Sequence, residues 1–174
     1  MLKLEVKDNF LSDKEFKIIL NNLDRIYFDY RDKGKDDYTD GFRHSFIPDE
    51  NNKWFFEKIK KTFFPNKKLK PTSCSYHLRC NKIKLIHKDD KTDYNFLLYL
   101  KGKETLFNGT GFFKEKELDT MISFKHNRAM FFNGRDVYHS DLQAFGESSF
   151  RYTINIFYKY DDNKNKHSDS WANK

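Results

Sequence analysis

At the centre of the chain stands Lys82-Ile83-Lys84-Leu85-Ile86-His87-Lys88-Asp89, in which alternating apolar residues lead into a His-x-Asp pair. The alternation predicts a strand that ends just before the pair. Residues two positions apart at a strand end project to the same side, so the side chains of His87 and Asp89 can face one point. Such a pair can share a metal ion with a third ligand that returns from later in the chain.

Two later residues form an ordered set with this pair. His139 supplies a second imidazole, and Arg151 follows it. Two imidazoles and one carboxylate make the facial triad of non-haem iron sites, which leaves positions on the metal open for a co-substrate and oxygen. A buried arginine nearby can hold the far end of a dicarboxylate. The set therefore predicts an iron centre with Arg151 beside it.

The His-x-Asp pattern occurs three times, so sequence context has to distinguish the copies. The pairs are His87/Asp89, His139/Asp141 and His167/Asp169. Only the first follows a strand pattern and precedes enough chain to return another histidine and then an arginine. The second pair could use only His167, from the polar tail, as its further histidine. The alternatives are a surface histidine at a strand end for His87, a turn carboxylate for Asp89, and a hydrogen-bonded core or surface histidine for His139.

Length and composition favour one domain with an aromatic core. The chain has 174 residues, of which 19 are Phe and 10 are Tyr. Aromatic side chains bury large areas, so a sizeable core is possible although hydrophobic residues make up only 37%. The formal net charge of +7 permits an acidic partner such as nucleic acid. The lysines are spread along the chain, however, which favours solubility over a nucleic-acid surface.

The cysteines and the hydropathy pattern bear on location. Cys74 and Cys80 lie in one predicted strand, about 20 Å apart and beyond the reach of a disulfide. Reduced cysteines are typical of a cytosolic protein. No apolar run is long enough for a secretory or membrane-spanning segment. We therefore expect a cytoplasmic protein without a membrane partner.

The first 70 residues favour helices. Alternation from Leu2 to Val6 predicts a strand, and Ser12 with Glu15 forms a capping box that begins a helix. A second helix opens at Pro48-Asp49 and ends near Pro65. The expected apolar stripes are Phe16, Ile19, Leu20 and Leu23 on the first helix, and Trp54, Phe55, Ile59 and Phe63 on the second.

A polar loop lies between the two predicted helices, from Arg31 to Gly41. Together with Tyr30 and Tyr38 it is a candidate flap over a substrate, and an ordinary charged loop is the alternative. The segment from Phe42 to Ile47 allows a further strand.

From Pro71 onward, short strand patterns alternate with turn signals. The predicted strands are Cys74 to Cys80, Lys82 to Ile86, Tyr94 to Leu100, Gly111 to Lys114, Thr120 to Phe124, Ala129 to Phe132 and Arg151 to Tyr160. This spacing favours a sandwich or jelly roll. We expect a single domain over residues 1–160, with helical support over about 1–70, a jelly-roll core over about 71–160, and a polar tail over 161–174.

Six segments stand in the order of one known family, namely His87-Lys88-Asp89, Leu97-Leu98-Tyr99-Leu100, Asn108-Gly109-Thr110-Gly111-Phe112, Arg128-Ala129-Met130-Phe131-Phe132, His139 and Arg151-Tyr152-Thr153. They resemble the prolyl 4-hydroxylase-type branch of the iron/2-oxoglutarate dioxygenases. The run Val6-Lys7-Asp8-Asn9-Phe10-Leu11-Ser12 also resembles the strand-to-helix entry of that family. The resemblance thus covers nearly the whole chain, and its specificity lies in the order of the motifs.

The resemblance implies a fold and an iron site. The fold is mostly β with supporting helices (α+β), a double-stranded β-helix of the jelly-roll, cupin-like kind preceded by N-terminal helices. The implied iron ligands are His87, Asp89 and His139. Arg151 is implied as the salt-bridge partner of the C5 carboxylate of 2-oxoglutarate.

The resemblance also suggests further co-substrate contacts. Tyr99 stands where some members place a hydroxyl on that same carboxylate. Thr153 matches an Arg-x-Ser/Thr pattern, although filling a strand would explain it equally, and Asn155 could take the polar role instead. The segment from Leu78 to Ile83 departs from the Tyr and Gly-containing turn of many relatives, and Tyr76 is a candidate substitute.

The implied activity is hydroxylation of a substrate C–H bond at Fe(II), with 2-oxoglutarate and O2 as co-substrates. Ascorbate is a candidate reductant. Peptidyl proline is the leading substrate by analogy with the family, which implies a protein or peptide partner. One alternative is an oxygenase of a nucleobase, a free amino acid or another small molecule. The +7 charge motivates the nucleobase, but alkylated-base demethylases typically carry a second arginine where this chain has Phe157.

A second alternative is a catalytically inactive, cupin-like binding protein. The presence of His87, Asp89, His139 and Arg151 together argues against it, because a site without turnover would not need all four.

Overall fold

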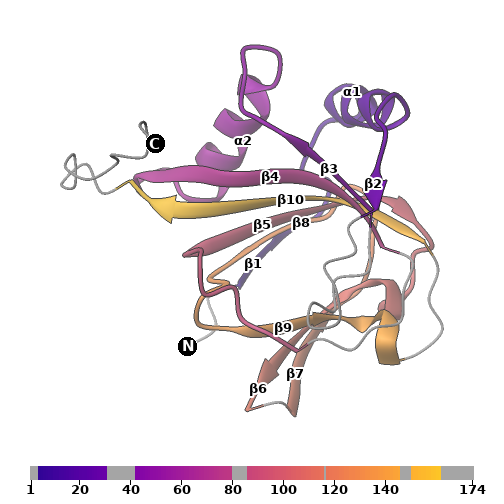
Figure 1. Ribbon diagram of the computed structural model, residues 1–174, viewed down its shortest axis with the longest axis vertical. Coiled ribbons are helices and arrows are strands. Elements are labelled where there is room, and N and C mark those ends of the chain that lie inside the picture. Colours follow the sequence, from indigo (N-terminus) through magenta and orange to yellow (C-terminus); the bar gives the residue numbers. More distant parts are fainter. Residues whose placement is uncertain (1–3, 31–41, 80–85, 116, 146–149, 162–174) are drawn as a thin grey trace, which may run out of the picture.

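The strands of the computed structural model form two sheets that face each other, and two helices cover the outer side of the larger one (Figure 1). The structure describes residues 4–30, 42–79, 86–115, 117–145 and 150–161. The larger sheet has the strand order β1-β8-β5-β10-β4-β3-β2, and the smaller has the order β7-β6-β9. The strand pairs among the described residues are antiparallel.

The elements in chain order are β1 (Leu4–Lys7), α1 (Asp13–Leu23), β2 (Asp29–Tyr30), β3 (Phe42–Phe46), α2 (Lys53–Phe63), β4 (Leu69–Arg79), β5 (Tyr94–Gly102), η1 (Leu106–Asn108), β6 (Thr110–Lys114), β7 (Glu117–Ile122), β8 (Ala129–Phe132), β9 (Tyr138–Asp141), η2 (Leu142–Phe145) and β10 (Arg151–Tyr160). The two η elements are short 3-10 helices. Among the described residues, no helix is both long and apolar enough to cross a membrane.

Helix α1 begins where the capping box predicts. The side chain of Ser12 accepts a hydrogen bond from the backbone N–H of Glu15 (3.4 Å), and the Glu15 carboxylate accepts one from the backbone N–H of Ser12 (2.7 Å). Ile19 and Leu23 are buried, and Phe16 and Leu20 pack against the same core. The predicted stripe is therefore confirmed.

Helix α2 begins at Lys53, four residues later than Pro48-Asp49 suggests. The reason is local, because the carboxylate of Asp49 accepts hydrogen bonds from the backbone N–H groups of Asn51 and Asn52 and holds them in a turn. The stripe on this helix is confirmed, with Phe55, Ile59 and Phe63 buried and Trp54 partly buried.

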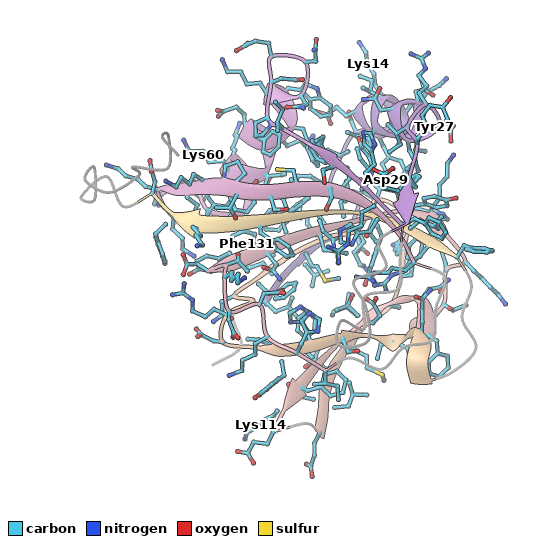
Figure 2. All side chains as sticks on the ribbon, in the orientation of Figure 1. Lys14, Tyr27, Asp29, Lys60, Lys114 and Phe131 are labelled. Atoms are coloured by element: carbon cyan, nitrogen blue, oxygen red, sulfur yellow. The ribbon has the colours of Figure 1, made fainter. Side chains whose placement is uncertain are left out.

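The larger sheet separates an apolar face from a partly polar one, because side chains alternate along each strand. Its outer face, toward the helices, carries the main core, including Phe96, Leu98, Phe131, Ile154 and Ile156. Figure 2 shows side chains filling the space between the helices and this sheet, while Lys14, Tyr27 and Lys60 project from the surface.

The inner face of the larger sheet points toward the smaller sheet. Its apolar part, on β5 and β8, packs with residues of β6 and its surroundings in a second cluster of Leu97, Tyr99, Phe112, Phe124, Met130 and Phe132. Its polar part lies on β10 and β4, where Arg151 pairs with Arg79 and Thr153 pairs with His77. The alternation of β10 thus turns its polar residues into the space between the sheets.

Most strand predictions agree with the structure to within two residues at each end, and those for β4 and β7 are less accurate. Strands β5, β8 and β10 are confirmed almost to the residue. No sequence pattern predicts β9, the strand that carries His139, or the two-residue β2. The predicted strand Lys82 to Ile86 lies, apart from Ile86, outside the described residues, as do the candidate flap of Arg31 to Gly41, Cys80 and residues 162–174. Cys74 is a buried free thiol, and burial raises its pKa to about 12.

Candidate metal centre

His87 and His139 are brought together by a single β-bridge. His87 lies just before β5, outside the named strands, and its backbone pairs antiparallel with that of His139 on β9. The backbone N–H of each donates to the carbonyl oxygen of the other, at 3.0 and 2.9 Å. The two rings lie with their centroids 4.5 Å apart. The spacing of the two imidazole rings is therefore set by backbone pairing, which does not depend on the identity of the side chains.

Asp89 reaches the same point two residues later. Its backbone N–H donates to the carbonyl oxygen of Gly134 at 3.0 Å, which fixes the turn after the bridge. Its carboxylate lies 3.1 Å from Nε2 of His139 and 3.6 Å from Nε2 of His87. One ligand atom from each of the three residues lies within 4.8 Å of the others. The structure thus gathers the three side chains that the sequence pattern grouped.

The surroundings of the three residues favour a ligating state. His139 donates from Nδ1 to the carbonyl oxygen of Val137 (3.1 Å), so Nε2 is the ring nitrogen that faces Asp89 and that a metal ion would bind. Burial alone would raise the pKa of Asp89, but the hydrogen bond and charge of His139, with the hydrogen bond from Asn95, hold that pKa below its ordinary value. Asn95, buried on β5, donates its side-chain N–H to the Asp89 carboxylate.

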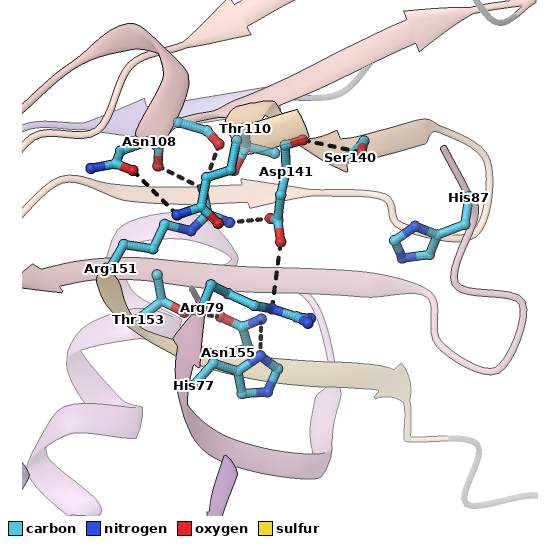
Figure 3. Close-up of polar contacts among 12 residues, drawn as sticks. His77, Arg79, His87, Asn108, Thr110, Ser140, Asp141, Arg151, Thr153 and Asn155 are labelled. Carbon is cyan, nitrogen blue, oxygen red and sulfur yellow. Dashed lines mark hydrogen bonds and ion pairs between the residues drawn. The ribbon is translucent and has the colours of Figure 1, made fainter. Parts of the chain in front are cut away.

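Arg151 lies at the start of β10 and is only 2% exposed. Its Nη1 donates to the carbonyl oxygens of Asn108 (2.6 Å) and Gly109, and its Nη2 donates to the carboxylate of Asp141 (Figure 3). Its Nε has no hydrogen-bond partner among the described residues. The sequence predicts the burial of this arginine but not its ion pair with Asp141.

Asp141 lies between two guanidinium groups. Nε of Arg79, at the end of β4, is 3.4 Å from its second carboxylate oxygen. Burial would raise the pKa of Asp141, but the positive charges of Arg151 and Arg79 outweigh burial and lower it, so the carboxylate is ionised. Asp141 follows His139 by two positions on β9, and the two side chains therefore project to the same side of that strand.

Tyr99 is fully buried on β5 close to this arginine. Its hydroxyl lies 2.8 Å from Oγ1 of Thr110, and Cζ of Arg151 lies 5.7 Å from its ring centroid. Burial raises the pKa of Tyr99 to about 12, so the phenol stays neutral and can donate a hydrogen bond. Tyr99 is therefore near enough to Arg151 to contact the same ligand.

Thr153 and Asn155 belong to a line of buried and partly buried hydrogen bonds on the inner face. Thr153 donates to the Asn155 side-chain oxygen (2.9 Å), and the Asn155 amide nitrogen lies 3.1 Å from Nδ1 of His77. Nε2 of His77 lies 2.8 Å from the hydroxyl of Ser75. Thr153 is thus hydrogen-bonded to Asn155, and Asn155 to His77, whereas among the described residues no hydrogen bond joins Thr153 or Asn155 to Arg151.

Tyr76 does not substitute for a co-substrate contact. It lies in the outer core, with its ring centroid 5.2 Å from that of Phe46, on the face opposite to its neighbour His77. The prediction of Tyr76 as a contact is therefore wrong, and His77 is the inward residue at this part of β4.

Four residues of the site were missed from the sequence, namely His77, Arg79, Asn95 and Asp141. His77 and Arg79 fall on alternate positions of β4, and Asn95 lies on β5 at a similar alternation with Leu97 and Tyr99. The signal for Asp141 was its spacing of two from His139, which the sequence pattern offered only as a chance His-x-Asp pair. No residue pattern alone indicates its ion pair with Arg151, because the two are brought together by the packing of the sheets.

The fold is similar to several solved structures. A prolyl hydroxylase from Trichoplax adhaerens, in complex with a hypoxia inducible factor oxygen degradation domain peptide, gives a TM-score of 0.63 at 13% identity, over 90% of this chain and 83% of that chain. The viral collagen prolyl hydroxylase of Paramecium Bursaria Chlorella virus-1, in its 2OG complex, gives 0.60 at 16% identity, over 90% and 95%. HygX from Streptomyces hygroscopicus, with nickel, 2-oxoglutarate and hygromycin B bound, gives 0.67 at 10% identity, over 92% and 84%.

No protein-family model matches the sequence, and no curated protein does either. At these low identities the structural likeness establishes the fold. The chain has the double-stranded β-helix of 2-oxoglutarate/Fe(II) oxygenases, prolyl hydroxylases among them. The fold expected from the resemblance is therefore confirmed.

Proposed function

We propose that this chain is an Fe(II)- and 2-oxoglutarate-dependent dioxygenase that hydroxylates a C–H bond of its substrate. The observation that carries the proposal is the convergence of His87, Asp89 and His139, whose ligand atoms lie within 4.8 Å of one another on a fold of this class. Two imidazole nitrogens and one carboxylate oxygen are the donor set of the non-haem Fe(II) facial triad.

The residues also fit 2-oxoglutarate. A buried donor normally has an acceptor, and Nε of Arg151 has none among the described residues. A carboxylate arriving from the co-substrate would supply that acceptor and bring a charge opposite to that of the guanidinium. Tyr99, neutral and buried beside Arg151, is the second donor that such a carboxylate would meet.

When bound, the iron with 2-oxoglutarate and O2 would supply the oxidation, in which one oxygen atom enters the substrate C–H bond and the other enters succinate as carbon dioxide is released. The protein's own residues fix the geometry. Val137 holds the proton of His139 on Nδ1, Asn95 orients the Asp89 carboxylate, and Arg151 anchors the far carboxylate of 2-oxoglutarate. The apolar side chains Leu97 and Phe132 keep water from this part of the space between the sheets.

For the substrate, we propose a prolyl residue of a peptide. Two considerations support this choice: the resemblance of the sequence to the prolyl 4-hydroxylase-type branch, and the likeness of the fold to prolyl hydroxylases, one of them solved with a peptide. A small molecule is the second candidate, which the likeness to HygX with hygromycin B bound favours.

Substrate-stimulated succinate formation tests the function. Purified protein with Fe(II), 2-oxoglutarate and ascorbate is incubated with Pro-containing peptides, the same peptides with Ala in place of Pro, free amino acids, aminoglycosides or oligonucleotides. We expect the Pro-containing peptides alone to accelerate succinate release and to gain one oxygen atom by mass spectrometry. If the Ala-substituted peptides accelerate succinate release equally, or if only another class of compound accelerates it, the prolyl proposal is wrong and the assignment as an oxygenase still holds.

A further inference from the structure

The arginine that would anchor the co-substrate already binds a carboxylate of its own chain. Asp141 contacts Nη2 of Arg151 through one oxygen and approaches Nε of Arg79 through the other (Figure 3). Asp141 lies on β9 of the smaller sheet, whereas Arg151 and Arg79 lie on the neighbouring strands β10 and β4 of the larger sheet. The three side chains meet in the space between the two sheets. The role of this ion-pair cluster rests on the proposed function, because it concerns how 2-oxoglutarate reaches Arg151.

The donors of Arg151 leave one place for a second carboxylate. A guanidinium binds a carboxylate with two parallel hydrogen bonds, either through Nη1 with Nη2 or through Nε with Nη2. Nη1 is engaged by the carbonyl oxygens of Asn108 and Gly109, and Nε has no partner among the described residues. The available edge is therefore Nε with Nη2, and Nη2 is the nitrogen that Asp141 contacts.

Two carboxylates at one nitrogen repel each other, particularly in a space that is shielded from water. The Arg151 side chain cannot move away, because it is 2% exposed and donates hydrogen bonds to two backbone carbonyl groups. Asp141 and Arg79 have more room, with side chains that are 28% and 19% exposed. When a second carboxylate arrives, Asp141 is the group that can move, and Arg79 is the cation that can accept it.

We infer that Asp141 is a positioning residue that competes with the far carboxylate of 2-oxoglutarate for Arg151, and that Arg79 takes over Asp141 when 2-oxoglutarate binds. The pair Arg79 and Asp141 then sets the affinity for the co-substrate without touching the iron. The competition involves only the far carboxylate, so it distinguishes 2-oxoglutarate from 2-oxo acids that end in a methyl group.

Calorimetric titration of the Fe(II)-loaded protein without oxygen tests this inference. The variant Asp141→Asn keeps the shape of the side chain and removes its charge. We expect Asp141→Asn to bind 2-oxoglutarate about tenfold more tightly than the wild type, the scale of one charge-assisted hydrogen bond. Its affinity for 2-oxopentanoate, which has five carbons and no far carboxylate, stays unchanged. The conservative variant Asp141→Glu keeps the charge and retains the weaker binding.

Arg79 provides the matched test if Asp141→Asn folds poorly. Arg79→Gln removes the alternative partner, so Asp141 stays on Arg151 and 2-oxoglutarate binds more weakly, again without an effect on 2-oxopentanoate. In the double variant with Asp141→Asn, Arg79→Gln no longer changes the affinity for 2-oxoglutarate. If Arg79 acted only by adding positive charge to the site, its removal would weaken 2-oxoglutarate binding in the double variant as well.

The outcomes separate this inference from the proposed function. Unchanged or weaker binding of 2-oxoglutarate by Asp141→Asn, in a protein that melts like the wild type and binds Fe(II), overturns the competition and leaves the oxygenase standing. An effect of Arg79→Gln that survives in the double variant overturns the role of Arg79. If neither wild type nor variant binds 2-oxoglutarate, the proposed function itself is wrong.

Discussion

Asn95 supports the candidate metal centre without being one of its three proposed ligands. Its amide donates to the Asp89 carboxylate, and a Cβ on Gly134 would lie 2.6 Å from that amide, so the neighbouring turn packs directly on it. The hydrogen bond holds Oδ2 of Asp89, the oxygen that lies 3.1 Å from Nε2 of His139. Residues in this position typically determine how tightly a metal is held.

Replacement of Asn95 by Ala should therefore weaken Fe(II) binding by about tenfold to a hundredfold, the usual effect of losing such a support. Anaerobic titration of the protein with Fe(II) measures the change. Asn155→Ala is the control, because it removes a partly buried amide that contacts His77 instead of Asp89. Equal losses of Fe(II) affinity in the two variants would mean that Asn95 acts through the stability of the fold and not through its hydrogen bond to Asp89.

Among single residues, the two histidines, the aspartate and Arg151 are predictable as a set because their order along the chain is informative. Asp141 and Arg79 are not, because an ion pair between β9, β10 and β4 depends on how the strands pack. Alternation indicates which side of a strand a residue faces, but not which residue of another strand it meets. The ion-pair partners that surround Arg151 can therefore be identified only from the structure.

Among the elements, helix α1 was predicted well and strand β9 was not predicted. The signals for α1 are local, since the capping box and the apolar stripe all lie within twelve residues of Ser12. Strand β9 has only four residues, Tyr138 to Asp141, without a clear apolar alternation. It is a strand because β6 pairs with it on one side and His87 bridges it on the other.

The cap of α1 can be tested by itself. Ser12→Ala removes the side chain that accepts from the N–H of Glu15, and we expect the free energy of unfolding to fall by about 1 kcal/mol. Urea unfolding measures it. Ser73→Ala, at an exposed position of β4, is the control and should change stability by less than about 0.5 kcal/mol. A Ser12→Ala protein as stable as the wild type would show that packing alone holds the helix.

For the whole molecule, the strand order of the larger sheet could not be read from the sequence. Strand β1 pairs with β8 and strand β10 lies between β5 and β4, so neighbours in space are far apart in the chain. What the sequence does predict is that aromatic side chains form the core, and Phe131 confirms it by stacking on Phe63, Phe64 and Tyr94. The residues of the outer core are predictable from hydropathy, whereas their partners depend on topology.

Two carboxylates link distant segments and should make stability depend on pH. The hydrogen bond from Arg128 lowers the pKa of Asp8 to about 2, and the hydrogen bond from Lys58 of α2 lowers that of Glu15 to about 2. Because both pKa values are lower in the folded state, their stabilisation is fully present above the ordinary values of 3.8 and 4.5 and is lost as pH falls toward 2.

The metal-free protein should therefore lose stability as pH falls from about 5 to about 2. Urea unfolding at several pH values measures the slope, and the double variant Asp8→Asn with Glu15→Gln should show a shallower one. A slope unchanged in the double variant would place the acid sensitivity elsewhere.

The proposed activity depends on one iron ion, held by His87, Asp89 and His139, at which 2-oxoglutarate is converted. The direct measurement is succinate release from 2-oxoglutarate by Fe(II)-loaded protein in air without added substrate, compared with Asp89→Ala. We predict slow but measurable succinate from the wild type and none from an Asp89→Ala protein that remains folded. No succinate from folded, iron-loaded wild type, or equal release by both proteins, would contradict the assignment of these three ligands.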